Sequence, residues 1–207
     1  MRLMTKNKLV YGHGVNDASY NVYKYKWDGK TNKAIWKCPF YTKWSAALQR
    51  CYSEKVQEKH PSYKGCAVCD DWLIFSNFRK WMKTQDWSGK ELDKDISGSK
   101  IYSPETCLMV SPNINKFFRD ILSNKRSFGY SWSGYSYQAR IVCKPLGVSL
   151  TKRFKVEDDA KNFYLEKRRY FAKKLILLEF GQDAGLEIIS NSNWLNIDND
   201  ISKSGEL

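Results

Sequence analysis

Basic and hydrogen-bonding side chains recur at alternate positions in two neighbouring segments, YQARIVCK (137–144) and GVSLTKRF (147–154). Successive residues of a β-strand point to opposite faces, so each segment would place its apolar residues on one face and its polar residues on the other. Guanidinium, amide, ammonium and hydroxyl groups are the ones that contact base edges and phosphates in duplex DNA. The candidate DNA-binding residues are Gln138, Arg140, Lys144, Thr151, Lys152 and Arg153.

Two aromatic residues, Trp132 and Tyr135, lie in the turn that precedes the first of these segments. Aromatic rings can stack on bases and sugars, and they can equally fill a protein core. Both alternatives stay open for this pair. We include them among the candidate DNA contacts.

The chain has six cysteines, and Cys66 and Cys69 form a CxxC pair within the stretch CAVC. Such a pair could ligate zinc together with Cys38, Cys51 or Cys107. A second closely spaced pair is lacking, and CAVC is also typical of a short buried strand. We therefore favour packed thiols over a zinc site, and we expect no disulfides in a reducing compartment.

Charge points to a polyanionic partner. The 207 residues include 35 Lys and Arg against 22 Asp and Glu, a net charge of +13. Residues 177–207 carry six acids against Lys203 alone, a net of −5, so the rest of the chain carries +18. A surface of this kind binds nucleic acid with release of counterions. Double-stranded DNA is the expected partner, and a homodimer is possible.

No run of about 18 apolar residues is present, and the first ten residues lack the apolar core of a signal peptide. We therefore expect no membrane partner and a location in the cytoplasm of a bacterial host. With 42% hydrophobic and 15% aromatic residues, the chain can form compact cores.

The elements that would position these residues follow from the hydrophobic period. Residues 9–36 indicate short strands and turns. A helix should run from Pro39 to about Tyr52, followed by a polar loop and the strand CAVC. A second helix, capped by Asp70 or Asp71, carries Trp72, Leu73, Phe75, Phe78 and Met82 on its apolar side.

Further along the chain, the strands ELDKDI (91–96) and ETCLMVS (105–111) precede a helix that begins at Pro112. The polar stretch LSNKRS (122–127) is the predicted domain boundary. Beyond it, three strands should be covered by one helix, residues 156–176, with acids in its first turn and lysines in its last. The last thirty residues lack a strong period.

Residues 38–117 resemble the HNH-type homing endonucleases of bacteriophages, over the run from CPFYTKWSAALQRCY to CLMVSPNINKF. Residues 128–164, FGYSWSGYSYQARIVCKPLGVSLTKRFKVEDDAKNFY, resemble the AP2-type DNA-binding domain that such enzymes carry. The resemblance implies an α+β chain in which an HNH-like ββα module with flanking helices precedes a three-stranded antiparallel sheet packed on one helix. The expected domains are an N-terminal β segment (1–36), the HNH-like module (37–122), the AP2-like domain (123–177) and an acidic tail (178–207).

In an HNH site, one strand supplies a general-base histidine beside a carboxylate metal ligand, and the helix supplies an asparagine or histidine. The resemblance places Asp93 and Asp95 on that strand and Asn115 on that helix. Asp93 occupies the position of the base, and Thr106 stands where the loop residue is usually asparagine. An aspartate with a pKa of about 4 is a poor base for metal-bound water. The catalytic set is therefore expected to be degenerate, with no cofactor, and with Mg²⁺ only if the site is active.

These expectations converge on a domesticated nuclease encoded by a phage or a phage satellite. The expected function is sequence-specific binding of double-stranded DNA that represses transcription by occupying a promoter or operator. The alternative is an active, metal-dependent, site-specific nicking endonuclease. The two differ only in the chemistry of Asp93, Asp95 and Asn115.

Overall fold

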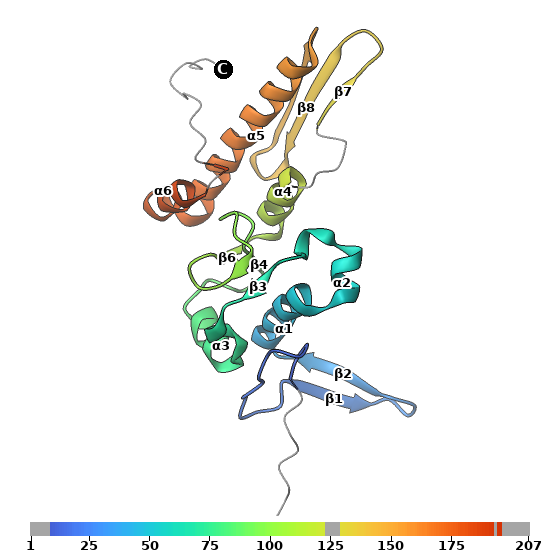
Figure 1. The fold of residues 1–207 in the computed structure, drawn as a ribbon, viewed down its shortest axis with the longest axis vertical. Coiled ribbons are helices and arrows are strands. Elements are labelled where there is room, and N and C mark those ends of the chain that lie inside the picture. Colours follow the sequence, from blue (N-terminus) through green and yellow to red (C-terminus); the bar gives the residue numbers. More distant parts are fainter. Residues whose placement is uncertain (1–8, 123–128, 193, 196–207) are drawn as a thin grey trace, which may run out of the picture. The chain divides into compact units, whose positions relative to one another are not determined.

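The computed structural model describes residues 9–122, 129–192 and 194–195 (Figure 1). The chain forms two compact units. The first comprises described residues within 1–94 and 99–109, and the second comprises described residues within 95–98 and 110–207. Helices and small sheets are both present, which confirms the α+β class. The predicted boundary at residues 122–127 falls mostly outside the described residues.

The core of the first unit is built around α1 (Pro39–Tyr52), whose predicted bounds are confirmed. Trp44, Ala47, Leu48 and Cys51 are buried along one side of this helix, as the three- and four-residue spacing predicts. The Trp44 indole Nε1 donates a hydrogen bond to the Trp72 carbonyl oxygen at 2.6 Å. This bond ties α1 to the segment that follows CAVC.

Two features of the first unit differ from the sequence prediction. The expected polar loop contains a short helix, α2 (Glu54–Lys59), and a 3-10 turn, η1 (Pro61–Tyr63). Asp70 and Asp71 do not cap the second helix, because they begin a 3-10 turn, η2 (Asp70–Leu73), and α3 (Phe75–Lys83) starts after Ile74. The Asp71 carboxylate instead accepts a hydrogen bond from the Asn77 side chain at 2.9 Å.

The expected N-terminal β segment contains an antiparallel hairpin, β1 (Tyr23–Trp27) and β2 (Asn32–Lys37) (Figure 1). Its register shifts between Lys24 and Tyr25, where β2 carries one extra residue, a β-bulge. Most residues of both strands are exposed. The hairpin therefore extends away from the core of its own unit.

Four short strands complete the central part of the chain. β3 (Ala67–Val68), within CAVC, pairs in parallel with β5 (Ile101–Tyr102). β4 (Glu91–Asp93) and β6 (Leu108–Val110) form a two-stranded sheet, and α4 (Pro112–Leu122) follows. The predicted order of strand, strand and helix is thus present, with the helix starting at Pro112 as expected.

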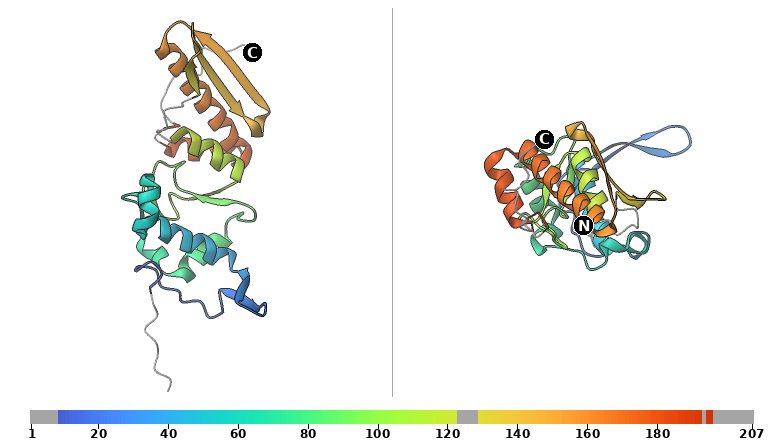
Figure 2. Two further views of the ribbon diagram at one scale, coloured as in Figure 1. Left: turned by 90° about the vertical axis from the view of Figure 1, so that its right-hand side faces the viewer. Right: turned by 90° about the horizontal axis from the view of Figure 1, so that it is seen from above.

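The second unit contains the predicted three-stranded antiparallel sheet, β7 (Tyr130–Trp132), β8 (Tyr137–Cys143) and β9 (Val148–Phe154), packed against α5 (Glu157–Phe180) (Figure 2). The acidic first turn of α5 is confirmed. The basic last turn is wrong, since the helix continues to Phe180 and its last turn holds no basic residue. Tyr164, Phe171 and Leu175 are buried as predicted.

Arg168 is buried on the same side of α5, which the apolar stripe does not indicate. Its Nη2 donates to the Phe117 carbonyl oxygen at 2.8 Å, and its guanidinium carbon lies 3.8 Å from the centre of the Phe117 ring. A guanidinium group can be buried in this way because it stacks on the ring while it forms a hydrogen bond. Arg168 therefore joins α5 to α4.

The expected acidic tail is partly helical. A second helix, α6 (Gln182–Asn191), follows Gly181, whose φ of 81° suits glycine. Beyond it, Ser192 and Leu195 are buried, and the Ser192 hydroxyl donates to the Ile96 carbonyl oxygen at 2.6 Å. Residues 193 and 196–207 lie outside the described residues. Within the described part of the chain, no helix is long and apolar enough to cross a membrane.

Candidate nucleic-acid interface

The β7–β8–β9 sheet has two faces of different composition, and its register fixes which residues share each face. Across the β8–β9 pair, Gln138 lies opposite Arg153 and Arg140 opposite Thr151. Residues directly opposite each other in an antiparallel pair point to the same side. The predicted alternation of β8 is confirmed by burial, since Ala139, Ile141 and Cys143 are buried while Arg140 and Val142 are exposed. In β9, Val148, Leu150 and Phe154 are half-buried and the residues between them are exposed.

The inner face of the sheet packs against α5. Ala139, Ile141 and Cys143 are buried there, together with Ala160 and Tyr164 of the helix. The Phe154 ring lies 5.3 Å from the Phe163 ring, centre to centre. This packing restricts the motion of the strands, because a sheet held by a helix on one side cannot shift register without exposing the apolar set.

Gly129 allows the chain to enter β7 close to β8 and α5. A Cβ atom at this position would lie 2.4 Å from the Arg140 carbonyl oxygen and 2.5 Å from the Tyr164 ring. Both distances are far below normal contact. The Arg140 backbone N–H donates to the Gly129 carbonyl oxygen, so the same close approach also extends the β7–β8 ladder.

We call the opposite side the outer face, and it carries the hydrogen-bonding residues. Arg140, Thr151 and Arg153 are exposed there and Gln138 is half-buried. Arg140 and Arg153 are diagonal neighbours across the β8–β9 pair, a relation that separates residues by about 7–8 Å. This spacing corresponds to about two base-pair steps, since one strand of duplex DNA carries a phosphate about every 3.4 Å.

Tyr135 belongs with the outer face through its contact with Arg153, whose guanidinium carbon lies 5.5 Å from the centre of the Tyr135 ring. The turn that carries Tyr135 is closed by hydrogen bonds of 2.8 Å from both the Ser133 backbone N–H and the Ser133 hydroxyl to the Ser136 carbonyl oxygen. The ring itself is 70% exposed. Tyr135 is thus held beside an arginine and open to solvent.

Two candidates lie on the inner side of the sheet. Trp132 is the last residue of β7 and does not lie in the turn, where the sequence placed it. It is opposite Tyr137 in the register, and their rings are 4.9 Å apart. Lys152 falls between the inner residues Leu150 and Phe154, and its Nζ lies 5.2 Å from the Phe163 ring of α5. Neither Trp132 nor Lys152 shares the face of Arg140 and Arg153.

Lys144, the remaining candidate, begins the 3-10 turn η3 (Lys144–Leu146) between β8 and β9 and is exposed at the end of the sheet. Sequence reasoning missed Ser131, which lies opposite Gln138 and so contributes a hydroxyl to the outer face. The signal for it was the strand register, which the turn length between β7 and β8 determines.

The charged residues in the strands and turns of the sheet are all basic, and the acids Glu157, Asp158 and Asp159 follow in the first turn of α5. Residues 129–155 contain three lysines and two arginines and no acidic residue, a net charge of +5. A surface with hydrogen-bonding groups, one sign of charge and a rigid support can bind an anionic polymer and also discriminate among its parts.

The residues expected from the HNH resemblance do not share one compact unit. Asp93 is buried at the end of β4 in the first unit, whereas the half-buried Asp95 and Asn115 belong to the second. The Thr106 hydroxyl donates to the Ile101 carbonyl oxygen at 2.6 Å, which shapes the loop between β5 and β6. The described residues offer no group of three or more His, Cys, Asp or Glu placed to hold a metal ion.

All six cysteines are free thiols. Cys66 is buried, and its Sγ lies 3.9 Å from the Ser62 carbonyl oxygen. Cys69 is half-buried, and burial raises the pKa of its thiol. The buried Cys66 and the half-buried Cys69 thus lie on either side of β3.

Comparisons of the chain with protein-family models, with curated proteins and with solved structures found no significant match.

Proposed function

We propose that the protein binds double-stranded DNA sequence-specifically through the outer face of the β7–β8–β9 sheet, and that it represses transcription by occupying a promoter or operator. The observation that carries the proposal is the pair of exposed arginines, Arg140 and Arg153, on one face of a sheet that α5 supports from behind. Arginine is the side chain that most often reads guanine in the major groove, through two parallel hydrogen bonds.

The neighbouring groups fit this role. Gln138 can pair with adenine through its amide, and Thr151 can contact either a base or a phosphate. The major groove, about 12 Å wide, admits β-strands as well as helices. The resemblance of residues 128–164 to AP2-type domains supports the same use of the sheet.

The repressor function follows from occupancy, because a protein bound tightly to a promoter excludes other proteins from it. Neither strand cleavage nor a cofactor is needed. The proposed partner is duplex DNA at a defined sequence, and affinity should fall steeply with salt as counterions return to the phosphates.

The test is selection of bound sequences from a random duplex library, followed by footprinting on the selected site. On that site, Arg140→Ala and Arg153→Ala should each weaken binding by about 1–3 kcal/mol. Arg140→Lys keeps the charge and loses the planar fork, so it should lose specificity while it retains non-specific affinity. Lys161→Ala, an exposed residue in the first turns of α5, is the control for charge loss.

The proposal fails if neither arginine substitution changes the footprint. The nicking alternative, which the order β4, β6, α4 favours, has its own test. The selected site is incubated with the protein and Mg²⁺ or Mn²⁺. Efficient nicking that disappears in Asp93→Ala or Asn115→Ala would show that the function is cleavage and not repression.

A further inference from the structure

The β1–β2 hairpin carries a concentration of cationic and aromatic side chains that the fold of its unit does not use. Residues 23–37 contain five lysines and one aspartate, a net charge of +4. Three large side chains on it are mostly exposed: Tyr25 at 58%, Trp27 at 60% and Ile35 at 63%. Exposed large apolar groups that gather in one place usually mark an interaction site.

The register sorts these side chains onto two faces. Tyr23, Tyr25 and Trp27 alternate along β1 on one face, which we call the aromatic face, and the Tyr23 and Tyr25 rings stack 5.8 Å apart. Lys24 opposite Trp36, and Lys26 opposite Lys33, form the other, which we call the lysine face. The Lys24 ammonium lies 5.5 Å from the Trp36 ring centre.

The hairpin is fixed at its base. The Cys38 backbone N–H donates to the Val22 carbonyl oxygen at 2.8 Å, and the Tyr23 ring contacts the Tyr41 ring of α1 edge-on at 5.7 Å. Val22 and Cys38 are both buried. The two strands therefore leave the core in a defined direction.

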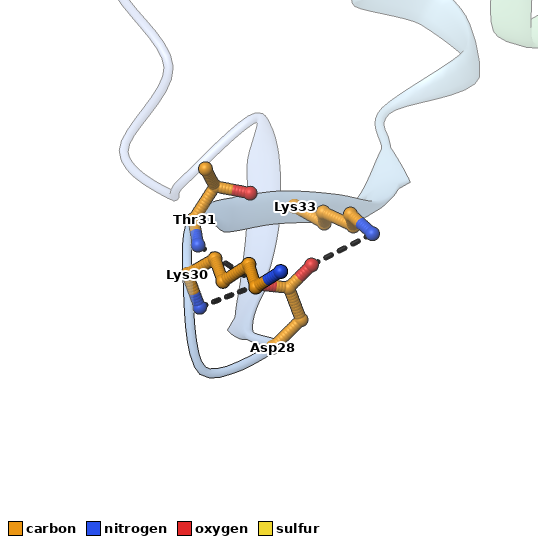
Figure 3. A network of polar contacts seen from close by, with 4 residues as sticks. All are labelled: Asp28, Lys30, Thr31 and Lys33. Atoms are coloured by element: carbon orange, nitrogen blue, oxygen red, sulfur yellow. Dashed lines mark hydrogen bonds and ion pairs between the residues drawn. The ribbon is translucent and has the colours of Figure 1, made fainter.

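The tip is fixed by Asp28 (Figure 3). Its carboxylate accepts hydrogen bonds from the backbone N–H groups of Lys30 at 2.9 Å and Thr31 at 2.8 Å, and it pairs with the Lys33 ammonium at 2.7 Å. The only acid of the hairpin is thus engaged within the hairpin. A folded arm binds with a smaller loss of conformational entropy than a loop that must order on contact.

These observations favour a polyanion over an apolar partner. Three of the four side chains on the lysine face are lysines, and the hairpin keeps a net charge of +4 although Lys33 pairs with Asp28. Alternation of lysines with exposed aromatic residues suits phosphates on one side and sugars on the other. A two-stranded β-ribbon is also one of the shapes that a DNA groove admits.

We infer that the β1–β2 hairpin is a second duplex-DNA contact, separate from the outer face of the sheet. Its lysine face binds phosphates, and the exposed rings of Tyr25 and Trp27 contact the deoxyribose sugars. Because phosphate contacts carry no sequence information, the hairpin adds affinity for any duplex, whereas the outer face selects the site. This inference goes beyond the proposed function. It can be wrong while the proposed function of the sheet is right.

The test uses the full chain and a duplex of random sequence, with binding followed by fluorescence anisotropy over a series of salt concentrations. Lys24→Gln with Lys26→Gln should lower the slope of log affinity against log salt by about 2, since each lost phosphate contact removes about 0.9. Lys55→Gln with Lys59→Gln, two exposed lysines of α2 in the same unit, removes equal charge and should change the slope little.

A second pair of variants tests the aromatic face. Trp27→Ala should weaken binding by about fivefold, because the ring that packs on the sugars is lost, and Trp27→Phe, which retains a ring, should keep most of the affinity. Because Trp27 is exposed, neither change should affect folding, which circular dichroism checks.

Equal effects of the hairpin and α2 double variants would overturn the inference, as would hairpin-dependent binding that prefers single-stranded to duplex DNA. Arg140→Ala measured on the selected site separates the two sites. If Arg140→Ala loses specific binding while the hairpin variants behave like the α2 control, the proposed role of the sheet is supported and the hairpin inference is wrong. If only the hairpin variants change the affinity for duplex DNA, the hairpin inference is supported and the proposed role of the sheet is wrong.

Discussion

The β7–β8–β9 sheet and the β1–β2 hairpin are both basic and antiparallel, but they differ in what lies behind them. The sheet has a buried inner face against α5, with Ile141 only 1% exposed. The hairpin has two exposed faces, and only its base contacts a core. The sheet is therefore supported by a helix along one whole face, whereas the hairpin is held only at its base.

This difference bears on the kind of recognition that each element can perform. Under the proposed function, hydrogen bonds to base edges require donors on a fixed backbone, and the packing of the sheet on α5 fixes the strands that carry Arg140 and Arg153. Phosphates tolerate looser geometry, because much of the binding comes from charge and counterion release. Two basic surfaces of similar charge therefore suit different tasks.

The largest expected effect comes from removing the support of the sheet. Ile141→Ala should destabilise the second unit by about 2–5 kcal/mol, since a buried isoleucine is replaced by a cavity. The same change at Ile35 on the hairpin should cost less than about 0.5 kcal/mol, because its side chain is largely in solvent. Hydrogen exchange in a series of urea concentrations measures the two effects separately, at β8 and α5 for Ile141→Ala and at β1 and β2 for Ile35→Ala. Equal effects would show that the two elements do not differ in support.

A smaller effect is expected at the edge of the sheet. Gly129→Ala should destabilise the second unit by about 1–3 kcal/mol, because the new Cβ meets the Arg140 carbonyl oxygen and the Tyr164 ring. Ser131→Ala, two residues further on the outer face, is the matched control and should stay within about 0.5 kcal/mol of the wild type. A wild-type melting temperature in Gly129→Ala would contradict the close approach of β7 to Tyr164.

The smallest effect concerns the tip of the hairpin and is local. The ion pair with Lys33, followed by the Thr31 and Lys30 backbone N–H groups, lowers the pKa of Asp28 from 3.8 to about 2. The carboxylate therefore stabilises the turn at all pH values above its ordinary pKa, and this contribution is lost as the pH falls through about 2. An NMR titration of the Asp28 carboxyl carbon measures the shift.

Lys33→Gln should raise the pKa of Asp28 toward its ordinary value, whereas Lys30→Gln keeps the backbone donor and should change it less. An Asp28 that titrates near pH 4 in the wild type would argue against the closed tip.

Part of the architecture could be predicted because the hydrophobic period was strong. The bounds of α1 and the alternation of β8 followed from the spacing of their apolar residues. The helix α2 was missed because EKVQEK is too short and polar to show a period. The helix α6 was missed because Gly185 interrupts its apolar stripe, although this glycine lies against Leu177 of α5, where a Cβ would meet Cδ2 at 2.9 Å.

The candidate site was predictable within a strand and less so between strands. Period two correctly separates Arg140 from Ile141, but the face of Trp132 depends on the turn that joins β7 to β8 and on their register. Lys152 shows a different limit, since its position between Leu150 and Phe154 indicates the inner side whereas its charge suggests the outer one. Position outweighs charge here because a long lysine stem can lie along aromatic rings and still keep its ammonium in solvent.

The bulge at the hairpin has a consequence for solubility. An exposed two-stranded ribbon offers unpaired backbone N–H and C=O groups along both margins, and a flat ribbon would recruit strands from other molecules into growing aggregates. The extra residue in β2 coils the ribbon and interrupts its regular pairing, while lysines flank the aromatic rings on each strand. The protein can thus display tryptophan and tyrosine in water without inviting self-association through the same surface.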